Sequence, residues 1–159
     1  MKGKCADIRK AERGDAALIL EFIRGIAAYE KMENDVVATV ELIEQQLFDN
    51  RRAEVIFAME DGKEVGFALF FHNFSTFVGR SGLYLEDLFV YPEYRGKGYG
   101  KALFLELVRI AHERGCGRME WVCLNWNSPS IDFYRSMGAV PLNDWTTYRL
   151  AGDAISRLL

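Results

Sequence analysis

The stretch that most constrains this chain is residues 81–111, SGLYLEDLFVYPEYRGKGYGKALFLELVRIA. A hydrophobic, strand-like run from Leu83 to Val90 leads into a basic glycine-rich loop, Arg95–Lys101, and then into apolar residues that recur at helical spacing. Glycines let backbone N–H groups approach an anion, and the dipole of the following helix favours negative charge. The stretch predicts a strand, loop and helix that bind a phosphate-bearing ligand. A solvated basic loop that caps the helix is the simpler alternative.

Two other phosphate-binding loops fit this stretch poorly. A Walker A loop ends in Gly-Lys-Ser/Thr, whereas Gly100-Lys101 is followed by Ala102, so no hydroxyl is placed for magnesium. A dinucleotide fingerprint needs a third glycine after two intervening residues and an acid about 20 residues onward. Here the glycines alternate with other residues, and Glu120 is the one candidate for that acid. The pattern that fits is Arg-x-x-Gly-x-Gly, which begins at Arg95.

A second motif lies downstream, in the run WNSPSIDFY from Trp126 to Tyr134, followed by Gly138-Ala139. Asn127 or Ser128 can cap a short helix that has a proline in its first turn, and Gly138 suits a left-handed C-terminal stop. Both motifs resemble the signatures of the GNAT superfamily of N-acetyltransferases, and the resemblance covers roughly residues 6–151. Within the superfamily, the chain is most similar to the spermidine/spermine (diamine) acetyltransferases. Their pattern is matched by residues 29–33, 84–87 and 126–134.

The expected elements fit that resemblance. The expected strands are 7–10, 54–59, 64–71, 83–91, 119–124 and 146–150, and the expected helices are 15–31, 40–48, 99–114 and 128–137. Thr39 can cap the second helix, and Asp61-Gly62 predicts a tight hairpin turn. Strands and helices in this mixed order predict an α/β (α+β) fold with a mixed sheet flanked by helices. The resemblance implies one N-acetyltransferase domain over residues 1–159, with a mostly antiparallel sheet.

The resemblance also implies the reaction, which is direct transfer of an acetyl group from acetyl-CoA to a primary amine of a small molecule, without a metal. Glu86 is the predicted base, because a carboxylate in a mostly apolar strand has a raised pKa and can accept the ammonium proton, directly or through a water. Regular alternation predicts that Glu86 and Asp87 face opposite sides of the sheet, so the role expected of Asp87 is structural. Tyr134 is the predicted acid for the departing thiolate.

Binding residues follow from the same resemblance. A bulge in the central strand would leave the backbone N–H groups of Leu88 or Val90 aimed at the oxyanion. The residues expected to bind the cofactor are Leu88, Phe89, Val90, Arg95, Gly96, Lys97, Gly98, Tyr99, Gly100, Lys101, Asn127, Ser130 and Tyr134. Those expected at the amine substrate are Tyr29, Glu30, Glu86 and Asp87. For Tyr29 and Glu30, an ordinary helix end is an equal alternative.

Composition narrows the class of protein. A chain of 159 residues, half of them hydrophobic, can bury most of the surface of one domain. A net charge of −3 argues against nucleic acid as a partner, and no apolar run approaches the length of a membrane span. His72 and His112 are too few for a metal site and are expected at the surface or a sheet edge. The three cysteines, Cys5, Cys116 and Cys123, lack metal spacing and favour a reducing, cytoplasmic location.

Two departures from the polyamine enzymes leave the amine open. Thr146 stands where those enzymes place a glutamate, with Asp144 as the nearest substitute, and the second and third strands are joined by a tight turn instead of a longer loop. The substrate could be a diamine or polyamine, a lysine-like or thialysine-like amino acid, or another primary amine. Alternatives from other classes are a non-catalytic acyl-CoA-binding sensor and a nucleotide-binding regulatory domain. A homodimer is expected from the subfamily, with Phe74, Phe77 and Trp145 as exposed aromatic residues.

Overall fold

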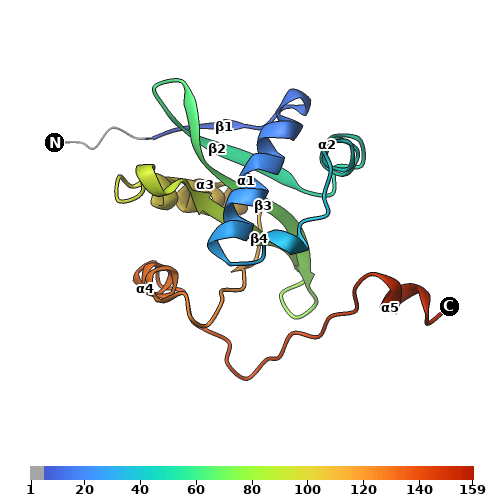
Figure 1. The fold of residues 1–159 in the computed structure, drawn as a ribbon. Helices are drawn as coiled ribbons and strands as arrows, with labels where there is room; N and C mark the ends of the chain where they lie inside the picture. Colours follow the sequence, from blue (N-terminus) through green and yellow to red (C-terminus); the bar gives the residue numbers. More distant parts are fainter. Residues whose placement is uncertain (1–5) are drawn as a thin grey trace. The chain divides into compact units, whose positions relative to one another are not determined.

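The computed structural model describes residues 6–159, so Cys5 lies outside the described residues. The chain divides into two compact units, one that extends to Val122 and one from Cys123 to Leu159. The first unit contains a five-stranded sheet and three α-helices, α1 to α3, and the second contains two short helices, α4 and α5 (Figure 1). Within residues 6–159, no helix is long and apolar enough to cross a membrane.

The sheet of the first unit has the strand order β1-β2-β3-β4-β5. The strands from β1 to β4 pair antiparallel, and β5 is added parallel to β4. Their bounds are Asp7–Lys10, Glu54–Glu60, Lys63–Ser75, Arg80–Val90 and Met119–Glu120. Between β2 and β3, Asp61 and Gly62 have φ values of 49° and 78°, which is the left-handed backbone that a two-residue hairpin turn requires. The predicted mixed, mostly antiparallel sheet flanked by helices is confirmed.

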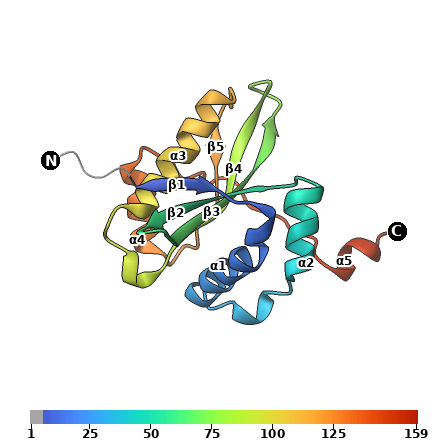
Figure 2. The ribbon, with the colours of Figure 1, turned by 90° about the horizontal axis from the view of Figure 1, so that it is seen from above.

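Helices cover both faces of this sheet (Figure 2). One face carries α1 (Ala16–Tyr29) and α2 (Val40–Ile43), which continues as a π-helical turn, Glu44–Asp49, and the other carries α3 (Tyr99–Glu113). Thr39 caps α2 as predicted, because its Oγ1 accepts a hydrogen bond of 3.2 Å from the Leu42 N–H. The core under α1 is built on Phe22, whose ring centroid lies 5.1 Å from that of Phe67. This apolar packing fixes α1 against the sheet.

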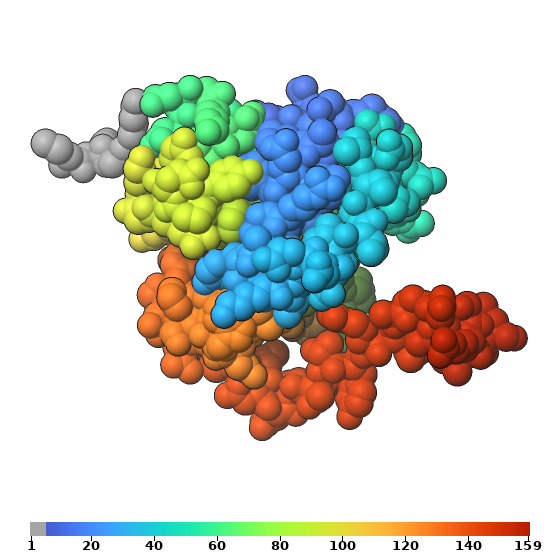
Figure 3. Space-filling model, viewed as in Figure 1, coloured from blue at the N-terminus to red at the C-terminus, as the bar shows by residue number. Residues whose placement is uncertain are grey.

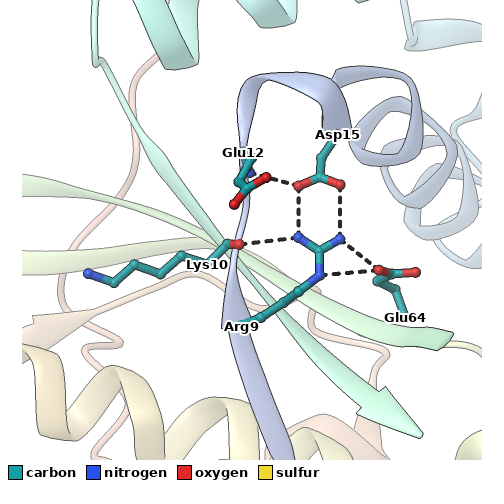
Figure 4. A network of polar contacts seen from close by, with 5 residues as sticks. All are labelled: Arg9, Lys10, Glu12, Asp15 and Glu64. Atoms are coloured by element: carbon teal, nitrogen blue, oxygen red, sulfur yellow. Dashed lines mark hydrogen bonds and ion pairs between the residues drawn. The ribbon is translucent and has the colours of Figure 1, made fainter. Parts of the chain in front are cut away.

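A charged network ties the start of the chain to the sheet (Figure 4). Arg9 on β1 donates two hydrogen bonds, of 2.8 and 2.9 Å, to the carboxylate of Asp15 and others to Glu64 on β3. Its guanidinium also lies 4.7 Å from the centroid of the Phe57 ring. The pKa values of Asp15 and Glu64 are lowered, chiefly by these hydrogen bonds from Arg9. We call Arg9, Asp15 and Glu64 the Arg9 network, in which both acids pair with the same cation.

The central strand β4 contains a bulge. Opposite it on β3, Leu69 pairs with Asp87 but Phe70 pairs with Leu85, so Glu86 is an extra residue without a partner. On its other side β4 pairs with β5 only at Leu83 and Tyr84. The bulge bends β4 just beyond that point, which ends the parallel ladder. The predicted strand 119–124 is therefore shorter than expected and ends at Glu120.

The predicted strand 146–150 is wrong. The chain from Ala139 to Leu150 contains no strand, although Thr and Tyr favour extended backbone. Propensity by itself supplies no ladder of hydrogen bonds, and this stretch has no partner strand in the second unit. Elsewhere in that unit, α4 (Ser128–Ser136) is capped as predicted, since Asn127 Oδ1 accepts from the Ser130 N–H at 3.4 Å. Gly138 ends it with a φ of 88°, and the last helix, α5, is Asp153–Ser156.

Candidate active site

The second half of β4 has one open edge. Successive N–H groups of a strand point to opposite edges, and the Tyr91 N–H donates to Val65 O on β3 at 3.0 Å. Counting back from Tyr91 places the N–H groups of Leu88 and Val90 on the opposite edge, where β5 has already ended. The expected bulge is present. The N–H groups of Leu88 and Val90, which were predicted to face the oxyanion, point out from an edge of β4 that has no neighbouring strand there.

The glycine loop, Arg95–Lys101, follows this edge and leads into α3. Gly96 and Gly98 have φ values of 77° and 90°, which glycine adopts without strain, and Gly98 is the N-cap of α3. A loop of this shape directs backbone N–H groups and the positive end of the α3 dipole toward an anion. Three cations lie on it, at Arg95, Lys97 and Lys101.

One carboxylate holds this loop to the β2 end of the hairpin. Glu60 accepts hydrogen bonds from the Tyr99 hydroxyl, at 2.7 Å, and from Lys97 Nζ, at 3.1 Å. These bonds lower the pKa of Glu60, and the same contact raises the pKa of Tyr99 to about 12. Tyr99, predicted as a cofactor residue, therefore anchors the start of α3 to β2. The sequence analysis did not name Glu60, because nothing in the sequence joins it to the loop.

Arg95 packs inward. Its Nε donates to Val90 O at 2.9 Å, on the open edge of β4. Its guanidinium carbon lies 4.8 Å from the centroid of the Tyr29 ring and 5.4 Å from that of Phe89. In the space-filling view, the yellow loop lies against the blue of α1 (Figure 3). The basic loop and the last residue of α1 are thus in contact.

Three carboxyl groups lie near one another, at Glu30, just after α1, and at Glu86 and Asp87 on β4. We call them the acidic cluster. Burial, then the charge of Glu86 and then that of Glu30, raise the pKa of Asp87 to about 7. Burial and the charge of Glu86 also raise the pKa of Glu30. Within residues 6–159, none of the three forms an ion pair with a lysine or arginine. The cluster is an uncompensated negative site.

The bulge corrects one expectation about these residues. Regular alternation predicted that Glu86 and Asp87 face opposite sides of the sheet and cannot share a role. The extra residue at Glu86 interrupts the alternation, and the charge of Glu86 helps to raise the pKa of Asp87. Asp87 lies two residues before Phe89, which packs in the core under α1, so it faces the helix that ends beside Glu30. The side of the sheet that Asp87 faces could not be predicted, because a bulge leaves no clear mark in a sequence.

The remaining predicted residues fall outside this cluster. Asn127, Ser130 and Tyr134 belong to the second unit, where Asn127 caps α4 and Tyr134 lies within it. His112 is exposed at the end of α3. His72 has a structural role, because both of its ring nitrogens form hydrogen bonds. Arginine can only donate, so Arg114 Nη1 donates to His72 Nε2 at 2.9 Å. Its Nδ1 then donates to Gly82 O at 3.0 Å. No metal-binding group of three or more His, Cys, Asp or Glu residues occurs within residues 6–159.

A sheet that opens beside a glycine loop and a helix N-terminus favours a site for an extended, phosphate-bearing ligand. Comparison with known proteins identifies the class of protein. The pattern of the Acetyltransferase (GNAT) family matches residues 20–139. This chain belongs to the GNAT acetyltransferase family. That family uses acetyl-CoA to acylate amines, so the predicted superfamily and the predicted enzyme class, an amine N-acetyltransferase, are confirmed.

Individual relatives narrow the resemblance. The chain is 34% identical to a thialysine N-epsilon-acetyltransferase of Sus scrofa, and the match covers 95% of each protein. It is 32% identical over 89% of its length to a human spermidine/spermine N(1)-acetyltransferase-like protein 1, of which it spans 22%. An integron cassette protein from the mobile metagenome of V. cholerae has the same fold, with a TM-score of 0.81, 28% identity and 98% coverage of both chains. The predicted similarity to spermidine/spermine acetyltransferases is confirmed.

The residues of the first unit fit coenzyme A. The left-handed glycines of the loop leave room for a pyrophosphate: a Cβ built at Gly96 or Gly98 would meet no atom within 4 Å. The N–H groups of Leu88 and Val90, on the open edge of β4, could donate hydrogen bonds to an extended arm of the cofactor. When bound, acetyl-CoA supplies an activated acyl group as a thioester.

Proposed function

We propose that this protein transfers an acetyl group from acetyl-CoA to a primary amine of a small diamine, polyamine or lysine-like molecule. The observation that carries the proposal is the acidic cluster. Glu86 and Asp87 lie on the strand whose open edge runs toward the glycine loop, and Glu30 lies near them at the end of α1. None of the three forms an ion pair with a cation among residues 6–159. A bound ammonium group would supply the missing positive charge.

A second positive charge on the substrate fits the cluster better than a single one. One ammonium must give up its proton to react, so it cannot compensate the cluster throughout the reaction. An amine with another cationic group a few atoms away would keep neutralising Glu30 while the reacting nitrogen is deprotonated. Thialysine and spermidine, named for the relatives, share this feature. A cluster of three acids, rather than one, therefore favours a substrate with at least two amino groups.

The base must remove a proton from an alkylammonium, which costs about 4–5 kcal/mol at neutral pH if its pKa is near 10.4. We assign this step to the pair Glu86 and Asp87. Glu86 is exposed at the bulge and can reach a bound amine or its water, whereas Asp87 has a pKa of about 7. A base whose pKa lies near the working pH combines the ionised form with sufficient basicity. In this pair, Glu86 contacts the amine or its water, and Asp87 is the stronger base.

The remaining roles follow the sequence analysis. The N–H groups of Leu88 or Val90 stabilise the negative charge that develops on the carbonyl oxygen, and the glycine loop holds the pyrophosphate. Tyr134 donates a proton to the departing thiolate. Tyr134→Phe should then lower turnover by about 10²–10⁴-fold with little change in coenzyme A affinity. A thioester with a more acidic thiol should restore part of the rate, and full activity with the ordinary ester would remove Tyr134 from the mechanism.

The decisive experiment is a panel of amines with acetyl-CoA, scored by release of free thiol. Diamines, polyamines and lysine analogues should react, and monoamines of equal length should react more slowly. Binding of acetyl-CoA without steady thiol release on any amine would favour the rival function, a non-catalytic acyl-CoA sensor. Stabilisation by ATP or NAD instead of coenzyme A esters would indicate a nucleotide-binding regulatory domain.

Two further assignments accompany this function. We propose a homodimer, supported by the exposed aromatic residues Phe74, Phe77 and Trp145, of which the Phe77 side chain is fully exposed at the turn after β3. Light scattering that gives a monomer at assay concentration would refute it. We also propose a cytoplasmic location, which the three cysteines, an odd number, favour.

A further inference from the structure

The guanidinium of Arg95 joins three elements of the first unit. Its Nε donates to Val90 O on the open edge of β4, and its plane is bordered by the rings of Tyr29 and Phe89. Within residues 6–159, its two terminal nitrogens have no hydrogen-bond partner. They remain available to an anion on the glycine loop. One side chain can therefore contact the ligand, the strand edge and the end of α1 together.

The end of α1 is held closely against the same strand. Gly25 faces Phe89 so tightly that a Cβ there would lie 2.9 Å from the Phe89 ring. One turn later α1 ends at Tyr29, and Glu30 of the acidic cluster follows at once. The Tyr29 ring is therefore one residue from a carboxyl group of the proposed amine site and in contact with the arginine of the glycine loop.

We propose that Tyr29 is a positioning residue that couples the glycine loop to the acidic cluster. This inference rests on the proposed function. An anion on the loop fixes the Arg95 guanidinium, the guanidinium holds the Tyr29 ring, and the ring fixes the end of α1 that carries Glu30. Coenzyme A and the amine should then bind more tightly together than separately, and the coupling should be reciprocal. The resemblance placed Tyr29 at the amine; the contact with Arg95 gives it an indirect role instead.

The first test compares two substitutions at one position. Tyr29→Leu removes the ring and should raise both the Kd for coenzyme A and the KM for the amine by about threefold to thirtyfold, the range of a cation–π contact. Tyr29→Phe keeps the ring and should rescue most of both losses. If Tyr29→Phe restores the Kd for coenzyme A but not the KM for the amine, the Tyr29 hydroxyl contacts the amine. That result would overturn the indirect role. An unchanged Kd in Tyr29→Leu would overturn the coupling.

The second test is a double-mutant cycle measured by calorimetry with coenzyme A and no amine. Arg95→Met and Tyr29→Leu should each weaken binding, and the double variant should lose less than the product of the two losses. Losses that multiply in full would show that Tyr29 acts without Arg95 and would refute the proposal. Melting temperatures within a few degrees of the wild type, checked for each variant, would exclude general unfolding as the cause.

The two proposals fail in different ways. A wild-type protein that binds coenzyme A and acetylates no amine would refute the proposed function, and with it the part of this inference that concerns the amine. The cycle on coenzyme A affinity would still decide whether Tyr29 supports the loop. A wild-type enzyme that is active while Tyr29→Leu behaves as wild type in both constants would refute the inference alone.

Discussion

Two groups of acidic side chains in the first unit face the same helix layer and differ in their surroundings. In the Arg9 network, one guanidinium holds Asp15 and Glu64, and the pKa values of both acids are lowered. In the acidic cluster, Glu30 and Asp87 have raised pKa values and no cation. An acid that has a cation stabilises the fold, whereas an acid that lacks one costs stability and leaves a place for a ligand. The comparison separates acids that pair with a cation from acids that we propose bind a ligand, without reference to any relative.

The largest expected effect is on turnover, when the acidic cluster loses a charge. Glu86→Gln and Asp87→Asn should each lower kcat by about 10²–10⁴-fold, the usual range for a general base. Glu86→Gln should also move the rising limb of the pH–rate profile upward, and activity should partly recover at high pH, where free amine is abundant. An unchanged profile in both variants would place the base elsewhere. Glu113→Gln, on the exposed side of α3, is the matched control.

The same substitution at Asp87 should raise stability. Its pKa of about 7 lies above the ordinary value of 3.8, so the folded state binds more protons than the unfolded chain between these values. Wild-type stability should therefore fall as pH rises through that window, and the loss is complete above pH 7. Asp87→Asn should be more stable than wild type at pH 8, by on the order of 1–4 kcal/mol, and no more stable at pH 4. Chemical denaturation at both pH values measures this, and equal stability at pH 8 would argue against a buried charge.

Breaking the Arg9 network should have the opposite sign. Arg9→Met should destabilise the fold at pH 7 by about 1–2 kcal/mol, because partly buried hydrogen bonds to charged groups are lost. The depressed pKa values of Asp15 and Glu64 mean that their contribution is present above their unfolded pKa values and is lost as pH falls through the folded ones. The deficit should therefore shrink in acid, as both carboxylates of the folded protein become protonated. Turnover of the variant, measured where it is folded, should stay near wild type.

Arg109 offers a control for that prediction. It also pairs with two acids, Glu106 and Glu113, but all three lie along the exposed side of α3. Arg109→Met should change the free energy of unfolding by less than about 0.5 kcal/mol, as exposed helix pairs do. A loss equal to that of Arg9→Met would mean that burial and the Phe57 contact add nothing to the Arg9 network.

The smallest effect should come from Glu30. Glu30→Gln should raise the KM for a diamine by about threefold to tenfold and leave that for a monoamine nearly unchanged, because only the second cation loses its partner. Its effect on kcat should be small. Equal changes in KM for both amines would indicate that Glu30 binds the reacting nitrogen itself, and the division of the cluster into base and second-charge site would be wrong.

Much of the site could be predicted because its residues are close in sequence. The strand, loop and helix of residues 81–111 lie in the order expected, and Gly96 and Gly98 have the backbone that the motif requires. The cap of α4 by Asn127 and its stop at Gly138 are equally local. The strand expected at 146–150 was wrong because a strand depends on a partner that local sequence does not specify. The expected alternation of Glu86 and Asp87 was wrong because the bulge at Glu86 results from pairing with β3.

The sequence by itself therefore determined the family, the glycine loop, the helix caps and the identity of the acids. Each depends on neighbouring residues, whose spacing along the chain fixes their spacing in space. Only the tertiary structure decided which acids have a cation. Arg9 and Glu64 are 55 residues apart in the chain, and the fold brings them together as a cation and an acid. Glu30 and Asp87 are also far apart in the chain, but the fold brings them together as two acids without a cation. Burial and charge pairing depend on what the fold brings together. That difference separates carboxylates paired with Arg9 from the carboxylates that we propose bind the substrate.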